Sequence, residues 1–338
     1  TGEELEAMLP LSYPERAAKI LGKYLDDYDA GELLSALEAA YSKFEGDPAP
    51  LVKIDDGIYL LELWHGPTCA FKDMALTVLP YLLRRGSDIC GIKEKILILV
   101  ATSGHTGKAA PEGFKDAEGI KIMVFYPDDG VSKMQKLQMC TQEGSNVNVV
   151  AVKGNFDDCQ TAVKQIFSDE EYAKTLKERG YILSSANSIN FGRLAPQIAY
   201  YFSAYLDLVS GGQIEMGEGV DFSVPTGNFG NILAAYYAKR MGLPVRRLHC
   251  ASNMNNILTD FLSGGTYDTH REFYKTTSPS MDILISSNLE RLLFEVCGRN
   301  AARTAELMKE LKEKGAYTIT PQEKAAINET FDGGFANE

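Results

Sequence analysis

Short apolar segments alternate with longer amphipathic segments through the middle of the chain, and this alternation restricts the folds open to it. The segment 96–101 (ILILVA) is a continuous apolar run, typical of a strand buried on both faces of a sheet. Further strands are expected at 58–63, 120–126, 146–152, 181–184, 222–225 and 245–251. Helices are expected from about 108 and at 132–142, 156–167, 189–208 and 231–241. Strands that alternate with helices form right-handed crossovers, so the sequence predicts an α/β fold with largely parallel sheets.

Residues 1–48 are predicted to form a helical segment that precedes this alternation. Apolar residues recur there at helical spacing, as at Leu33, Leu34 and Leu37, and Asp47-Pro48 ends the pattern. The Gly-rich stretch 211–219 is expected to be a surface loop.

Composition excludes several classes of function. The chain of 338 residues has 34 Lys and Arg against 46 Asp and Glu, a formal charge of −12, which argues against nucleic acid and polybasic membrane binding. No apolar run reaches the ~18 residues of a spanning helix. The six cysteines and four histidines show no metal-ligand spacing, so no metal site or disulfide framework is expected. These features favour a cytoplasmic protein, and a local cradle for a small anion remains possible.

The loop 65–74 (HGPTCAFKDM) follows the first expected strand and carries Lys72. This lysine opens an apolar helix expected to continue through Leu79. An amine in an apolar setting has a lowered pKa and can form a Schiff base. The alternative is a lysine at a helix start whose ammonium reaches solvent.

Two further loops follow strands and precede helices. The loop 102–107 (TSGHTG) presents small hydroxyl residues and glycines at a helix N-terminus, which suits a carboxylate or phosphate. An ordinary capped turn is the alternative, with His105 in a structural role. The loop 225–231 (PTGNFGN) has glycines and asparagines that allow left-handed backbone, so its N–H groups can converge on a phosphate. It fits neither nucleotide-binding glycine motif.

A fourth loop, 185–193 (SANSINFGR), places amides and hydroxyls before an apolar helix, with Arg193 about one turn in. An arginine fork with Asn and Ser donors is suited to a phosphate or carboxylate. The alternative is a capped helix with a surface arginine.

These four loops, in this order, resemble those of the threonine synthases, pyridoxal 5'-phosphate (PLP) enzymes of the tryptophan-synthase-β-like fold, fold type II. The resembling segments are LELWHGPTCAFKDMAL, ATSGHTGKAA, SANSINFGRLAPQIAYYF and VPTGNFGNILAAYYAK, and the resemblance covers most of residues 5 to about 300. It implies two open, twisted, mostly parallel sheets flanked by helices. The implied domains are the helical segment 1–48, a discontinuous large PLP domain of 49–95 and 200–338, and a smaller α/β domain of 96–199.

The resemblance also implies site residues. Lys72 would bind the cofactor as a Schiff base and then shuttle protons. The residues implied at the cofactor are Phe71, Lys72, His105, Gly227, Asn228, Phe229, Gly230 and Asn231. Those implied at the substrate carboxylate and the cofactor ring are Ser103, Gly104, Thr106 and Gly107. Those implied at the substrate phosphate are Asn187, Ser188 and Arg193.

The implied reaction converts O-phospho-L-homoserine and water to L-threonine and phosphate, by γ-elimination followed by addition of water at Cβ. The implied assembly is a monomer or a homodimer. Two alternatives stay open: an ammonia-lyase of the same fold, and a non-catalytic relative that binds a phosphorylated metabolite. The clamp at 187–193 argues against the first, and Lys72 argues against the second.

The chain departs from the family pattern in two ways. His105 stands where relatives usually have Asp, so contacts of that side chain are not carried over. The chain also begins late and ends at Glu338, short of the segment that includes the partner of the pyridine nitrogen. We therefore expect a truncated chain.

Overall fold

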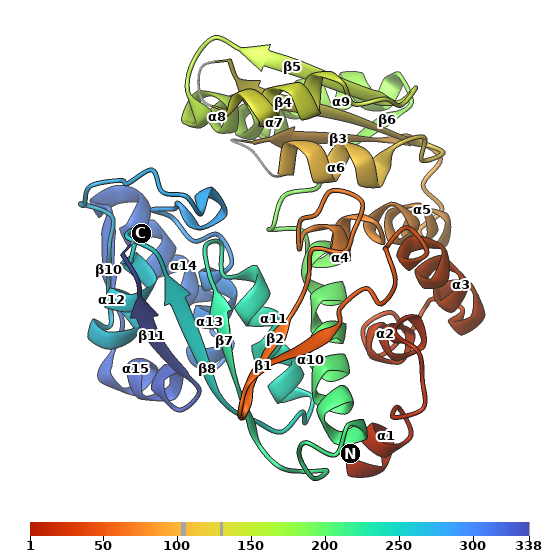
Figure 1. Ribbon diagram of the computed structural model, residues 1–338. Coiled ribbons are helices and arrows are strands. Elements are labelled where there is room, and N and C mark those ends of the chain that lie inside the picture. Colours follow the sequence, from red (N-terminus) through yellow and green to blue (C-terminus); the bar gives the residue numbers. More distant parts are fainter. Residues whose placement is uncertain (103–105, 129–130, 338) are drawn as a thin grey trace. The chain divides into compact units, whose positions relative to one another are not determined.

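Two parallel sheets, each packed against helices, organise the chain in the computed structural model (Figure 1). The structure describes residues 1–102, 106–128 and 131–337. Contacts divide the chain into an N-terminal unit, Pro10–Ala204, and a C-terminal unit, Thr1–Leu9 with Tyr205–Glu338. The sheets confirm the predicted fold class. The division joins 49–95 to 96–199, unlike the predicted domains, and that domain assignment stays a prediction.

The sheet of the N-terminal unit has four parallel strands in the order β5-β4-β3-β6. Its strands are β3 (Lys95–Ala101), β4 (Ile120–Pro127), β5 (Val147–Val152) and β6 (Tyr181–Ser185). Successive side chains of a strand point to opposite faces. Ile98 and Val100 of β3 are accordingly buried in one core cluster, and Leu99 is buried in another. Apolar side chains on both faces explain why the sequence of this strand is uninterrupted by polar residues.

Helices cover both faces of this sheet. Helices α6 (Thr106–Phe114) and α7 (Lys133–Cys140) bury Phe114 and Met139 in the first cluster. Helix α8 (Phe156–Ser168) buries Cys159 and Val163 in the second cluster. Helix α9 (Glu170–Glu178), for which the sequence analysis made no prediction, packs along β6.

The predicted helical segment is confirmed as three helices: α1 (Gly2–Glu6), α2 (Tyr13–Leu21) and α3 (Ala30–Tyr41). An antiparallel hairpin follows, made of β1 (Leu51–Asp55) and β2 (Ile58–Leu61).

The prediction of one continuous helix from Lys72 to Leu79 is wrong. Helix α4 (Asp73–Leu76) ends, and α5 (Leu79–Ile89) begins after a break. Pro80 has no N–H to donate to the carbonyl of Leu76, and its ring disfavours continued helix there. Gly113 of α6 approaches this carbonyl so closely that a Cβ at Gly113 would lie 2.4 Å from the oxygen. The break therefore also creates room for close helix packing.

Helix α10 (Phe191–Ser210) is the longest helix of the described chain and contains the boundary between the two units. Within the residues that the structure describes, no helix combines the length and apolar character needed to cross a membrane.

The C-terminal unit contains a three-stranded parallel sheet in the order β11-β8-β7. Its strands are β7 (Val220–Pro225), β8 (Val245–Ser252) and β11 (Phe331–Phe335). Helix α11 (Gly230–Arg240) follows β7, and α12 (Ile257–Gly264) follows β8 and packs against β11. The unit is completed by the antiparallel pair β9 (Thr266–Asp268) and β10 (Ala316–Thr318), by a 3-10 turn (Pro279–Met281), and by α13 (Leu289–Val296), α14 (Ala301–Lys314) and α15 (Pro321–Asn328).

An ion pair joins α14 to α15. Arg303 donates from Nε to Oε1 of Glu323 at 3.1 Å and from Nη2 to Oε2 at 3.3 Å. The amide of Thr320 also donates to Glu323 at 2.7 Å. The hydrogen bond from Arg303 is the main cause that lowers the pKa of Glu323 to about 2.

We predict that Glu323→Gln destabilises the protein in a pH-dependent way. An unfolded glutamate titrates near ~4.3. The lowered folded pKa therefore contributes stability that is present above about pH 4.3 and is lost as the pH falls toward 2. The free energy of unfolding should fall by about 1–3 kcal/mol at neutral pH. The difference from the parent should shrink in acid, as measured by urea unfolding. The exposed control Glu178→Gln should change little, and a deficit independent of pH would contradict the assignment.

Candidate active site

The loop between β2 and α4 is folded around the carboxylate of Asp73. This side chain is 1% exposed and accepts hydrogen bonds from the amide of Thr68 at 2.7 Å and from its hydroxyl at 2.6 Å. The chain passes so close that a Cβ at Gly66 would lie 2.6 Å from the Cβ of Asp73. Asp73 thus fixes the loop that carries Lys72 to the N-cap of α4.

The amine of Lys72 lies in an environment that favours its neutral form. The side chain is half-buried, and Nζ lies 5.3 Å from the centroid of the Phe71 ring. Burial, followed by the positive charge of Arg193, lowers the pKa of Lys72 to about 7, against a smaller opposite effect of Asp73. The amine is therefore partly unprotonated at neutral pH, as a nucleophile or general base requires.

Arg193 is a buried residue and not the surface arginine of the alternative interpretation. It is 4% exposed, in the first turn of α10, and donates from Nη1 to the carbonyl of Ala186 at 2.9 Å. Its Nε and the Oδ1 of Asn187 are buried without a hydrogen-bond partner among the described residues. Burial lowers the pKa of Arg193 to about 10. Ser188 is half-buried beside Asn187 in the same segment.

The predicted carboxylate loop is only partly within the described structure. Ser103, Gly104 and His105 lie outside the described residues. Thr106 and Gly107 begin α6. A Cβ at Gly107 would lie 2.3 Å from Sδ of Met139, so packing against α7 is itself a reason for glycine at this position. The roles of this loop toward a substrate carboxylate and the cofactor ring stay predictions.

The loop 226–231 has one residue in left-handed backbone, and it is not a glycine or an asparagine. Phe229 has φ of +62° and is the N-cap residue of α11. The expectation that glycine or asparagine would take this conformation is therefore wrong. Phe229 is 1% exposed, and its ring centroid lies 5.6 Å from that of Phe331. Core packing of the ring compensates the cost of left-handed backbone in a non-glycine residue.

This loop also has the features of an anion cradle. The amides of residues 227–230 have no hydrogen-bond acceptor within the described parts of the chain. They precede the N-terminus of an eleven-residue helix, where the helix dipole favours negative charge. Gly227 is needed for close approach, because a Cβ there would lie 2.7 Å from the carbonyl oxygen of Ser280. Asn231 lies in the first turn of the same helix.

The structure therefore groups the predicted residues by unit. Phe71, Lys72, Asn187, Ser188 and Arg193 belong to the N-terminal unit, and residues 227–231 belong to the C-terminal unit. The sequence analysis missed Asp73. The signal that was present is an acid directly after the lysine, five residues from a threonine able to donate to it.

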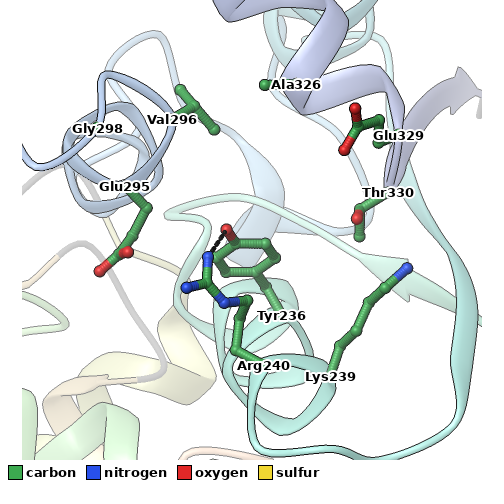
Figure 2. Close-up of a pocket in the computed structure, with 9 residues that line it drawn as sticks. All are labelled: Tyr236, Lys239, Arg240, Glu295, Val296, Gly298, Ala326, Glu329 and Thr330. Atoms are coloured by element: carbon green, nitrogen blue, oxygen red, sulfur yellow. Dashed lines mark hydrogen bonds between the residues drawn. The ribbon is translucent and has the colours of Figure 1, made fainter.

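A separate pocket of about 380 Å³ lies at the other end of α11 (Figure 2). Tyr236, Lys239 and Arg240 line it from α11, and Glu295 and Glu329 carry the opposite charge. In Figure 2 a hydrogen bond joins Nη1 of Arg240 to the hydroxyl of Tyr236, at 3.2 Å. The residues of α11 that line the pocket lie six to ten residues along the helix from Gly230, or roughly 9–15 Å. The pocket is thus distinct from the cradle.

Comparison with known proteins is consistent with this site. Residues 44–327 match the family described as "Pyridoxal-phosphate dependent enzyme". The human protein Threonine synthase-like 1 is 43% identical, over 96% of this chain and 44% of its own length. Threonine synthase of Pseudomonas aeruginosa is 41% identical, over 98% of this chain and 68% of its own length. The chain thus spans less than half of the first of these relatives.

Solved structures show the same relationship. The crystal structure of PLP-bound threonine synthase from Brucella melitensis has a TM-score of 0.91 and 42% identity, covering 100% of this chain and 70% of the other. Threonine synthase from yeast has a TM-score of 0.87 and 34% identity, covering 97% of this chain and 67% of the other.

We predict that Arg193→Ala raises the pKa of Lys72. The substitution removes the second cause that lowers this pKa and leaves burial, the first cause, in place. Competitive amine labelling of Lys72 at several pH values, followed by mass spectrometry, should show a midpoint near 7 in the parent and a higher one in the variant. Arg193→Lys keeps the charge and should stay close to the parent. Identical midpoints in parent and Arg193→Ala would show that Arg193 does not act on the amine.

Asp73→Asn is expected to act in the opposite direction. Because the charge of Asp73 raises the pKa of Lys72, its removal should lower the labelling midpoint. The variant should also lose about 1–3 kcal/mol in free energy of unfolding, since the new amide cannot accept both hydrogen bonds from Thr68. Thr68→Val is the matched control, because it removes one of those bonds and keeps the charge. An upward midpoint shift in Asp73→Asn would contradict this account.

Proposed function

Because the chain belongs to the family of pyridoxal-phosphate dependent enzymes, among the threonine synthases and their relatives, we propose that it has threonine synthase activity, a carbon–oxygen lyase reaction that releases phosphate. The proposed substrate is O-phospho-L-homoserine, and the products are L-threonine and phosphate. One observation carries the proposal: a lysine with a pKa of about 7 is influenced by a buried arginine whose Nε has no partner in the described structure.

The residues present fit PLP. Lys72 offers an amine that is partly neutral at pH 7, and the amides of residues 227–230 offer unpaired donors for its phosphate. Lys72 would hold the cofactor covalently, with Phe71 and His105 beside it. Residues 227–231 would hold the cofactor phosphate. When bound, PLP supplies an electron sink that makes protons on the substrate easier to remove.

Lys72 then acts as the acid and base of the reaction. With a pKa near 7, both of its forms are populated at neutral pH, so the same amine can take the proton from Cα and serve later transfers at Cβ. Ser103, Gly104, Thr106 and Gly107 would bind the substrate carboxylate. Water adds at Cβ after the phosphate has left.

Arg193 has two effects in this proposal. With Asn187 and Ser188 it binds the substrate phosphate and stabilises the negative charge that grows as the phosphate leaves. The bound anion also offsets the positive charge of Arg193, which lowers the pKa of Lys72. Substrate binding would therefore make Lys72 a stronger base at the moment when it must remove a proton.

An ammonia-lyase reaction is the competing function, and the segment 187–193 with its buried Arg193 argues against it. Substrates of such lyases carry a carboxylate, which is assigned to the loop 103–107, but no phosphate, so the unpaired Nε of Arg193 would have no second anion to bind. We also propose a cytoplasmic location, which agrees with six free cysteines.

The proposal is tested by phosphate release. With PLP added, the parent should release phosphate from O-phospho-L-homoserine and form threonine, and Lys72→Ala should do neither while staying folded. Arg193→Ala should lower kcat/KM. The fall should correspond to a loss of about 1.5–3 kcal/mol in transition-state stabilisation, as expected for a hydrogen bond to a charged group, and PLP affinity should be unchanged.

The activity of parent and Arg193→Ala should also be compared at a pH above the raised pKa of Lys72 in the variant. Lys72 is unprotonated in both proteins there, so a remaining difference reports the loss of phosphate binding. Arg84→Ala, a half-exposed arginine of the same unit, should behave as the parent. Release of ammonia from threonine or serine, without phosphate release, would favour the lyase instead.

A further inference from the structure

The carbonyl groups of the phosphate cradle are held by residues that follow it by about sixty positions. The hydroxyl of Ser286 donates to the carbonyl of Gly227 at 2.8 Å. Asn288 donates to the carbonyl of Asn228 twice, from its side-chain Nδ2 at 3.0 Å and from its backbone amide at 3.1 Å. Both carbonyls are thus engaged, whereas the amides of residues 227–230 have no acceptor in the described chain.

Asn288 occupies a position where a different contact is expected. It is the N-cap residue of α13, yet its side chain makes no capping hydrogen bond to that helix. Asn at an N-cap usually stabilises its own helix by about 1 kcal/mol. Here the side chain is 0% exposed. Its Nδ2 is directed to the cradle, and its Oδ1 accepts from Nε of Arg291 at 3.2 Å. The side chain thus contacts the loop and Arg291, and it does not cap the backbone of α13.

The segment that carries these residues is itself tightly held. The carboxylate of Asp282 accepts from Nδ2 of Asn253 at 2.8 Å and from Nδ2 of Asn255 at 3.0 Å. It also accepts from the hydroxyl of Thr276 at 2.8 Å and from its amide at 3.0 Å. The hydroxyl of Tyr267 accepts from the amide of Ser286 at 2.9 Å. These hydrogen bonds hold residues 276–288 in place, so that the segment can support the phosphate cradle.

We propose that Asn288 and Ser286 are positioning residues of the phosphate cradle. By binding the carbonyls of Asn228 and Gly227, they keep those peptide groups turned so that the amides face the anion. This inference rests on the proposed PLP site. It adds that phosphate affinity depends on side chains that do not touch the phosphate.

A purely structural role would lower stability without a selective effect on phosphate binding, so the test compares two ligands. PLP has a phosphate, whereas pyridoxal has the same aldehyde and ring without it. Affinity of the 338-residue chain for each is measured by borohydride trapping on Lys72 and mass spectrometry over a range of ligand concentrations. Asn288→Ala should bind PLP about tenfold more weakly, as expected for loss of one organising hydrogen bond, and pyridoxal as tightly as the parent.

Asn288→Asp is a second variant, which keeps the test valid if Asn288→Ala does not fold. Aspartate favours a helix N-terminus, and its buried carboxylate can pair with Arg291, which already donates to Oδ1 of Asn288, so the fold should be preserved. The carboxylate cannot donate to Asn228. The variant should also lose PLP affinity selectively. Ser286→Ala should give a smaller selective loss. The matched control is Asn146→Ala in the other unit, a buried asparagine that donates to the carbonyls of Phe114 and Ile120. It should lose stability and keep both affinities.

The outcomes separate the two proposals. A parent that is trapped with neither ligand would overturn the PLP site, and this inference with it. A parent that binds PLP, together with Asn288→Asp and Ser286→Ala variants of unchanged PLP affinity, would overturn the positioning role alone. Equal losses of PLP and pyridoxal affinity would also overturn it, since they would indicate a general disturbance.

Discussion

Burial of two cations, Lys72 and Arg193, is the constraint on which the N-terminal unit depends. Removing a charge from water without a partner costs several kcal/mol. The buried acid that acts on the lysine, Asp73, directs its carboxylate to Thr68 and compensates the lysine only in part. The amine responds by losing its proton readily, whereas the arginine stays charged with one N–H group unsatisfied. A bound anion would stabilise a unit with this arrangement, and the proposed substrate phosphate would supply that charge.

The two proposed phosphate sites use different chemistry. The one in the N-terminal unit relies on the full charge of Arg193, and the one in the C-terminal unit relies on neutral amides at the start of α11. A leaving group gains negative charge during a reaction, so a cation stabilises it most when the charge is greatest. A cofactor phosphate keeps its charge throughout, and a preorganised set of dipoles is sufficient to hold it. The difference between the two sites thus matches the difference between their proposed ligands.

Sequence was most informative where local pattern and tertiary contact agree. The uninterrupted apolar run of β3 predicted a strand buried on both faces, and the apolar surroundings of Lys72 predicted its lowered pKa. It was least informative where a distant contact overrides local preference. Phe229 is left-handed because its ring packs on Phe331, about a hundred residues later. Asn288 looks like a helix cap, and only the fold shows that it contacts Asn228. Pro80 is a sequence signal for the break after α4, but the helical periodicity of the apolar residues around it favoured one continuous helix.

The membership of the C-terminal unit bears on how the chain folds during synthesis. Thr1–Leu9 leave the ribosome before the rest of the described chain, yet they belong to a unit whose other residues begin at Tyr205 and whose sheet is completed by β11 at 331–335. Domains generally fold as units in the order in which they are made. Pro10–Ala204 can therefore fold while α1, with Leu5 still uncovered, has yet to pack against the rest of its own unit. Helix α1 is thus translated about two hundred residues before the rest of its unit, and its apolar side chain stays uncovered during that interval.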